Sequence, residues 1–273
     1  MFQKVAPESN FSSAISISVL IYHSAVRNIR KMHGNALFSI LVNLFQAVLF
    51  VAAFFVMFIV LGMRSAALRG DFLLYIMSGI FMFMTHVKAV DAVYKSEGPS
   101  SPMMKHAPMN TIISIISSAI SSLYIQVLTL SIILFVYHAA WNPIEIDKPI
   151  GALGMLLLAW FSGVSVGMIL LAIRPWYPGL TEALSLIWRR ANMIASGKMF
   201  VANTLPGFMI AMFDWNPLFH IIDQARGFVF INYNPHNSNT SYPLYLSLAI
   251  LMLGLMGEFY TRRRASASWS ARR

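Results

Sequence analysis

The stretch ALFSILVNLFQAVLFVAAFFVMFIVLG, residues 36–62, decides the fold because it is long, strongly apolar and free of charged residues. A helix needs about 20 such residues to cross the ~30 Å hydrocarbon layer of a membrane. Predominantly apolar runs of similar kind follow at 72–95, 111–140, 150–173 and 243–260. We therefore predict a membrane-spanning helix at each of these positions.

The composition agrees with a membrane protein. The 273 residues are 58% hydrophobic and only 11% charged, whereas a soluble domain carries about 25% charged residues. The chain contains no cysteine, so disulfides and thiolate metal sites are excluded.

The region between the fourth and last apolar runs is less regular. It begins as a cation-bearing helix and is then interrupted by Pro206 and by Asn216-Pro217. We predict a fifth span over 182–204 and short re-entrant helices over 205–230. Irregular backbone survives at membrane depth only where protein or a water-filled cavity satisfies its polar groups.

Residues 11–33 form an amphipathic pattern before the first span. Apolar side chains recur on one helical face, at Ile15, Val19, Tyr22, Val26 and Ile29. Basic residues follow just before the span, which favours a helix lying in the membrane interface. The alternative is a helix packed on its own protein. The predicted fold class is an all-α integral membrane protein, a single domain over 1–273, with this interfacial helix, six transmembrane helices and the re-entrant segment between the last two.

The positive charges orient the chain. With six spans, the two termini share one side, and most Lys and Arg residues outside the membrane lie there; Arg64, Arg69 and Lys148 lie on the other side. Both termini, including the tail 261–273, are therefore predicted in the cytoplasm. This distribution accounts for most of the net charge of +10, so the prediction includes no nucleic-acid partner.

The sequence lacks the motifs of several chemistries. It contains no G-x-x-x-x-G-K-[ST] phosphate loop, no H-E-x-x-H and no G-x-S-x-G. No two histidines lie three or four residues apart, so a helical metal pair is unsupported. We predict no catalytic residue, no metal and no cofactor in this chain, which would not be an enzyme.

The segment WNPLFHIIDQAR, residues 215–226, resembles a motif of one transporter family. The motif, W-N-P-L-x-H followed by two hydrophobic residues, E or D, and R three positions later, is typical of permease subunits of type 2 ABC transporters that export capsule, O-antigen and teichoic acid polysaccharides. The matching positions are Trp215, Asn216, Pro217, His220, Asp223 and Arg226. Weaker similarities extend over about residues 20–264. The family's Trp and Glu-Pro early in the first span are missing, which makes this a divergent member.

The resemblance implies a homodimer in the bacterial inner membrane with two copies of a separate ATPase subunit. That partner would bind ATP and Mg²⁺, and the polysaccharide would pass between the two permeases in contact with membrane lipid. Periplasmic and outer-membrane export partners are also implied. The ATPase would contact the proline-bounded cytoplasmic loop 97–108, through Met103, Met104, Lys105, His106 and Pro108.

Two further expectations come from helical spacing. Lys198 and Arg190 are eight residues apart and would share a broad face lining the translocation path, where they would favour an anionic chain. The alternative places Lys198 at the outer interface. Asn216 and Pro217 suit the first turn of a helix. Asp223 and Arg226 can then pair at i, i+3, in a segment that is either an outer gate or a packed hairpin.

Other functions remain open at this point. The first alternative is a permease of the same fold that exports a lipid or a small hydrophobic solute, because a fold does not determine function. A membrane enzyme would need titratable groups clustered in a pocket. A scaffold would have no reason to keep several cations inside the bilayer.

Overall fold

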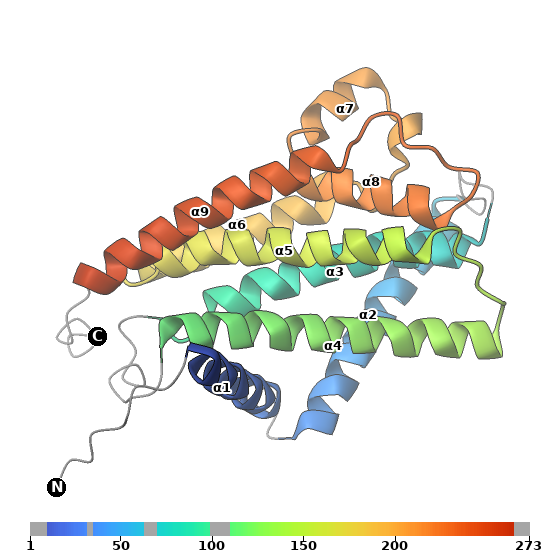
Figure 1. Ribbon diagram of the computed structural model, residues 1–273. Helices are drawn as coiled ribbons and strands as arrows, with labels where there is room; N and C mark the ends of the chain where they lie inside the picture. The colour runs from blue at the N-terminus through green and yellow to red at the C-terminus, as the bar shows by residue number, and fades with distance from the viewer. Residues whose placement is uncertain (1–9, 32–34, 63–69, 99–109, 265–273) are drawn as a thin grey trace, which may run out of the picture.

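The computed structural model describes residues 10–31, 35–62, 70–98 and 110–264, and every regular element in these ranges is helical (Figure 1). The elements are α1 (Asn10–Lys31), α2 (Ala36–Val60), α3 (Phe72–Tyr94), α4 (Thr111–Ala140), α5 (Pro149–Ile173), α6 (Pro178–Ala195), the 3-10 turn η2 (Ala202–Thr204), α7 (Gly207–Phe213), α8 (Pro217–Val229) and α9 (Ser241–Arg264). The predicted all-α membrane fold is confirmed.

Five helices in the described ranges are long and apolar enough to cross a membrane: α2, α3, α4, α5 and α9. They occupy the five apolar runs of the sequence. The remaining predicted span, 182–204, corresponds to α6, which begins earlier and already ends at Ala195. α6 is not among the five, because its 18 residues include the charged residues Glu182, Arg189 and Arg190.

Local sequence explains where the helices begin. The Asn35, Asp71 and Asn110 side chains each accept a hydrogen bond from a backbone amide in the first turn of α2, α3 and α4, as expected of N-cap residues. A proline stands in the first turn of α5, α6 and α8, where its missing N–H costs nothing.

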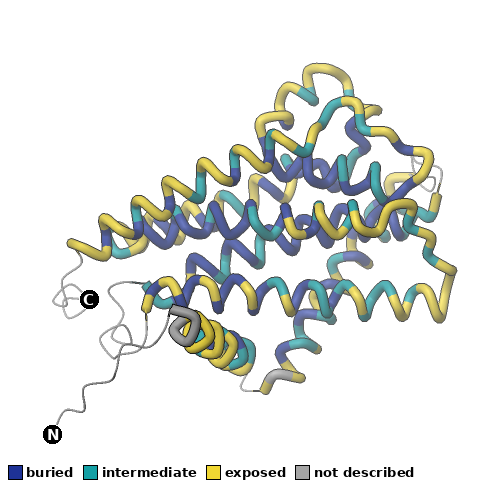
Figure 2. Tube along the Cα trace, viewed as in Figure 1, coloured by how far each residue is buried: buried dark blue, intermediate teal, exposed yellow. Residues whose placement is uncertain are grey.

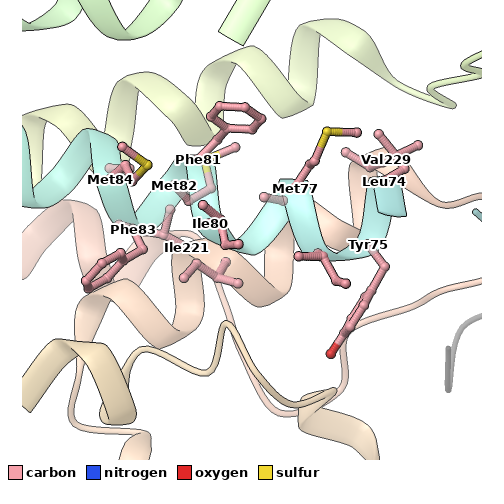
Figure 3. Close-up of a cluster of buried hydrophobic side chains, with 14 of the residues drawn as sticks. Leu74, Tyr75, Met77, Ile80, Phe81, Met82, Phe83, Met84, Ile221 and Val229 are labelled. Carbon is pink, nitrogen blue, oxygen red and sulfur yellow. The ribbon is translucent and has the colours of Figure 1, made fainter. Parts of the chain in front are cut away.

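The centre of the molecule is the packing of α3 against α5. Most side chains of α3 are buried, and Figure 2 shows α3 and the C-terminal part of α5 as mostly buried. Gly163 and Gly167 on α5 face the α3 backbone; a Cβ added to Gly167 would lie 2.9 Å from the Val90 carbonyl oxygen. Small residues four apart are typical of close helix packing in membranes. Figure 3 shows the adjoining apolar cluster, where Ile80 lies near Ile221 of α8.

α1 turns its apolar face away from the protein. Its other side packs on α4, where the Asn28 side-chain amide donates hydrogen bonds to the Ser117 and Ser118 hydroxyls at 3.3 and 3.2 Å. Val19 and Tyr22 of the apolar face are 47% and 66% exposed. This exposure favours the interfacial interpretation over packing on its own protein.

The two ends of the molecule differ. The C-terminal end of α9 and the N-terminal end of α4 lie at the left of Figure 1, whereas the region of α7 and α8 lies toward the opposite end. The segment that carries the sequence motif is therefore grouped at one end of the bundle.

Candidate functional site

The candidate site is the segment between α6 and α9, and Arg226 of α8 stands at its centre. The Arg226 side chain is 1% exposed. Its guanidinium donates to the backbone carbonyls of Gly197 (3.1 Å), Lys198 (2.6 Å) and Phe200, and it lies 4.3 Å from the ring centroid of Tyr75. One side chain thus satisfies three carbonyls of the turn that follows α6.

Two glycines permit this arrangement. Gly197 has φ +72, a left-handed conformation that other residues rarely adopt, and a Cβ there would lie 2.5 Å from the Phe219 ring. A Cβ at Gly79 of α3 would lie 2.8 Å from the Arg226 guanidinium. The turn, α3 and α8 therefore approach closely only because both positions lack a side chain.

The predicted ion pair between Asp223 and Arg226 is wrong: among the described residues the two carry no salt bridge, since each has other partners. The Asp223 carboxylate accepts hydrogen bonds from the Tyr233 hydroxyl and from the Ser238 hydroxyl, the latter at 2.6 Å. Burial, together with the Asp223 charge, raises the pKa of Tyr233 well above its ordinary value, so the hydroxyl stays protonated and donates. The Arg226 Nη1 and Nη2 groups donate to backbone carbonyls instead.

The start of α8 is built as predicted. Asn216 is the N-cap and accepts a hydrogen bond from the Leu218 amide at 3.0 Å, and Pro217 occupies the first turn. The Asn216 amide nitrogen also donates to the Asn192 side chain (3.0 Å) and to the Ala195 carbonyl (2.9 Å). This one residue therefore caps α8 and ties it to the end of α6.

His220 joins two loops. Its Nε2 lies 2.6 Å from the Asp214 carbonyl oxygen, and its Nδ1 lies 3.2 Å from the Asn239 amide nitrogen. A carbonyl can only accept and a backbone amide can only donate, so these contacts fit the neutral ring with its proton on Nε2. Trp215, in contrast, is 54% exposed.

The structure places Lys198 and Arg190 apart. The shared-face argument is wrong because α6 ends at Ala195, so Lys198 lies in the following turn. The Lys198 side chain is buried; its Nζ donates to the Met193 carbonyl and lies 3.9 Å from the ring centroid of Phe83. Aromatic faces and a carbonyl therefore satisfy this buried cation within the protein. Arg190 is exposed on α6.

A second buried polar group escaped the sequence analysis. His86 of α3 is fully buried, with Nδ1 2.8 Å from the Ser162 hydroxyl of α5 and Nε2 accepting from the Trp188 indole of α6 at 3.0 Å. Nearby, Arg189 of α6 pairs with Asp91 of α3 at 3.1 Å. These three contacts join residues 76, 102 and 98 positions apart in the sequence, which is why local spacing gave no signal of them.

The residues predicted to contact an ATPase, Met103, Met104, Lys105, His106 and Pro108, lie outside the described residues. Within the described ranges, no group of three or more His, Asp or Glu side chains is arranged to hold a metal ion.

Fold and site together define a polytopic α-helical membrane protein with a buried polar framework before its last helix. No protein-family model matches the chain. The chain is similar to the polysialic acid transport protein KpsM of Escherichia coli, with 22% identity over 203 residues, which cover 71% of this chain and 75% of that relative. This similarity confirms the resemblance to polysaccharide-export permeases that the motif at 215–226 had indicated.

Proposed function

We propose that this chain is the permease subunit of an ABC transporter that exports a polysaccharide across the bacterial inner membrane. The observation that carries the proposal is the 215–226 block: Asn216 fastens α8 to the end of α6, and Arg226 fastens it to the turn that follows α6. The similarity to a polysialic acid transport protein supports the same class of cargo.

The proposed assembly is a homodimer with two separate ATPase subunits that bind ATP and Mg²⁺. In this proposal α6 counts as a sixth crossing, because it returns the chain to the end of the bundle that holds α7 and α8 (Figure 1). Both termini then lie in the cytoplasm, an orientation supported by the three arginines that end α9. The end of the bundle that holds α7 and α8 then faces the periplasm, where further export partners would meet it. The absence of a phosphate loop from the sequence agrees with this division of labour.

The translocation path is proposed to include Arg190 and Lys198. Arg190 is exposed and can meet an anionic polymer directly. Lys198 would first have to leave the rings of Phe50, Phe54 and Phe83, which lie 6.0, 5.4 and 3.9 Å from its Nζ. Arg226 and the 197–200 turn that it bonds would hold the outer end of the path. They would serve either as a gate or as a fixed wall.

The proposal is tested through the coupling of this chain to its ATPase subunit. Replacing both Met103 and Met104 with Asp should place charge against the apolar surface of a partner, so the full chain should insert normally but lose its ATPase subunit on purification. The exposed Met212 of α7 would be too far from the cytoplasm to contact the ATPase in this proposal, so Met212→Asp is the matched control.

Normal export and normal ATPase co-purification in the Met103, Met104 double variant would remove the coupling proposal. The wild-type chain could instead co-purify with its ATPase and export no polysaccharide, while a lipid is lost from the inner leaflet. That result would identify an exporter of lipid.

A further inference from the structure

An open pocket lies at the proposed periplasmic end, between the α7–α8 turn and the beginning of α9. Its volume is about 610 Å³, within the range of pockets that hold small ligands. Six residues of its wall carry the argument below: Asp214, Trp215, His236, Asn237, Asn239 and Tyr242. We name it the Trp215 pocket.

The walls of the Trp215 pocket are fixed by hydrogen bonds between distant segments. The Tyr242 hydroxyl donates to the Trp215 carbonyl at 2.7 Å, and the Tyr242 amide donates to the Asn239 side chain at 2.8 Å. His220 links the Asp214 carbonyl to the Asn239 amide and packs on the Tyr242 ring, with 4.9 Å between ring centroids. The pocket is therefore pre-organised, which lowers the entropy cost of binding a ligand.

The groups that remain available have a mixed character. The Trp215 indole N–H is already satisfied by the Met212 carbonyl at 2.7 Å, yet the residue is 54% exposed. Its free surface is therefore an apolar aromatic face. Beside it, the exposed Asp214 carboxylate has no hydrogen bond or ion pair to any described residue, and the His236 side chain is also exposed.

This combination suits a sugar. A pyranose ring presents an apolar C–H face, which packs on an aromatic ring, and an edge of hydroxyls, which carboxylates and amides bind with charge-assisted or neutral hydrogen bonds. A sugar that carries its own carboxylate would be repelled by Asp214. A hydrophobic ligand would leave the Asp214 carboxylate without a hydrogen-bond partner.

We propose that the Trp215 pocket binds an uncharged, hydroxyl-rich pyranose unit of the exported polymer, with Trp215 stacking on the ring and Asp214 accepting from its hydroxyls. This inference rests on the proposed function and extends it, because it names the type of unit and the place where the chain is held as it leaves the permease. It holds irrespective of charge elsewhere on the polymer.

The experiment measures binding to the full chain in lipid nanodiscs. The probes are an array of short neutral and carboxylate-bearing oligosaccharides, followed by titration of each hit. We expect hits among the neutral sugars, a loss of affinity of about tenfold in Trp215→Ala, and retention of affinity in Trp215→Phe, which keeps an aromatic face. Trp141→Ala is the matched control, because Trp141 is 84% exposed and does not line this pocket.

Asp214→Asn separates the two kinds of sugar. The substitution should weaken a neutral ligand by about tenfold, because a charged acceptor is replaced by a neutral one, and it should strengthen a carboxylate-bearing ligand. No hit on the array, hits confined to acidic sugars, or hits indifferent to Trp215→Ala would each overturn the proposal.

Export assays distinguish this failure from failure of the proposed function. If wild-type cells export polymer through this chain and the Trp215 and Asp214 variants bind and export as well as wild type, the pocket inference fails while the export function stands. If removal of the whole chain leaves surface polymer unchanged, the proposed function itself fails.

Discussion

At the residue scale, the account depends most on Arg226. Its guanidinium bonds three carbonyls at once and lies over Tyr75, and a lysine cannot reproduce that planar fork. We expect Arg226→Ala and Arg226→Lys both to destabilise the chain by about 3 kcal/mol or more, because buried carbonyls lose their donors. Thermal unfolding of the detergent-purified chain measures this.

The matched control is Arg190→Ala, since Arg190 is exposed on α6. It should unfold at the wild-type temperature. An Arg226→Lys variant as stable as wild type would mean that the guanidinium contacts do not hold the 197–200 turn. That result would contradict the structural role given to Arg226.

The same residues mark how far sequence reasoning reaches. The N-cap at Asn216 was predictable because capping depends on neighbours in sequence. The Asp223–Arg226 pair was predicted from equally local spacing and was wrong, because the competing acceptors at 197–200 and donors at Tyr233 and Ser238 come from other parts of the chain. Local spacing cannot report such partners.

At the scale of the elements, the close packing of α3 and α5 carries the bundle. A Cβ at Gly163 would collide with the His86 carbonyl and lie 2.8 Å from the Ala89 Cβ. We expect Gly163→Ala to lower the free energy of unfolding by about 1–3 kcal/mol, as overpacking does. Thermal unfolding in detergent again provides the measurement.

Gly154 offers a control on the same helix, because a Cβ there would meet nothing within 4 Å. Gly154→Ala should be neutral or stabilise the helix by up to about 1 kcal/mol. If the two alanine variants behaved alike, the contact of Gly163 with α3 would not limit the packing.

The helices themselves were largely predictable. α4 spans 111–140 as predicted, because an uncharged apolar run and the Asn110 cap both mark it. α6 ends at Ala195 and not at 204 as predicted, and its length was hard to predict because apolar residues resume at 199–202 after Ser196, Gly197 and Lys198. What ends it is the left-handed turn at Gly197, which is held by contacts with Arg226 and Phe219 from elsewhere.

At the scale of the whole molecule, the charge of the path can be tested at Arg190. Lys198 is a poor probe, because Lys198→Glu would bury a carboxylate among phenyl rings. At the exposed Arg190, the Arg190→Gln variant should reduce export of an anionic polymer mildly. The Arg190→Glu variant should reduce it by about tenfold, because like charges repel. Surface polymer on intact cells at matched expression measures this effect.

Lys148→Glu serves as the control, since Lys148 lies in the loop before α5 and not on the proposed path. It should export normally. Equal and unimpaired export in Arg190→Gln and Arg190→Glu would show that this side chain does not meet an anionic chain.

The central proposal is that this chain exports a polysaccharide across the inner membrane, and the location of that polymer tests it most directly. In cells from which the chain has been deleted, the total amount of polymer should persist while surface polymer disappears, because the polymer is retained inside. Restoring the wild-type chain should return the polymer to the surface. Surface polymer that remains at the wild-type level in the deleted cells would contradict the account.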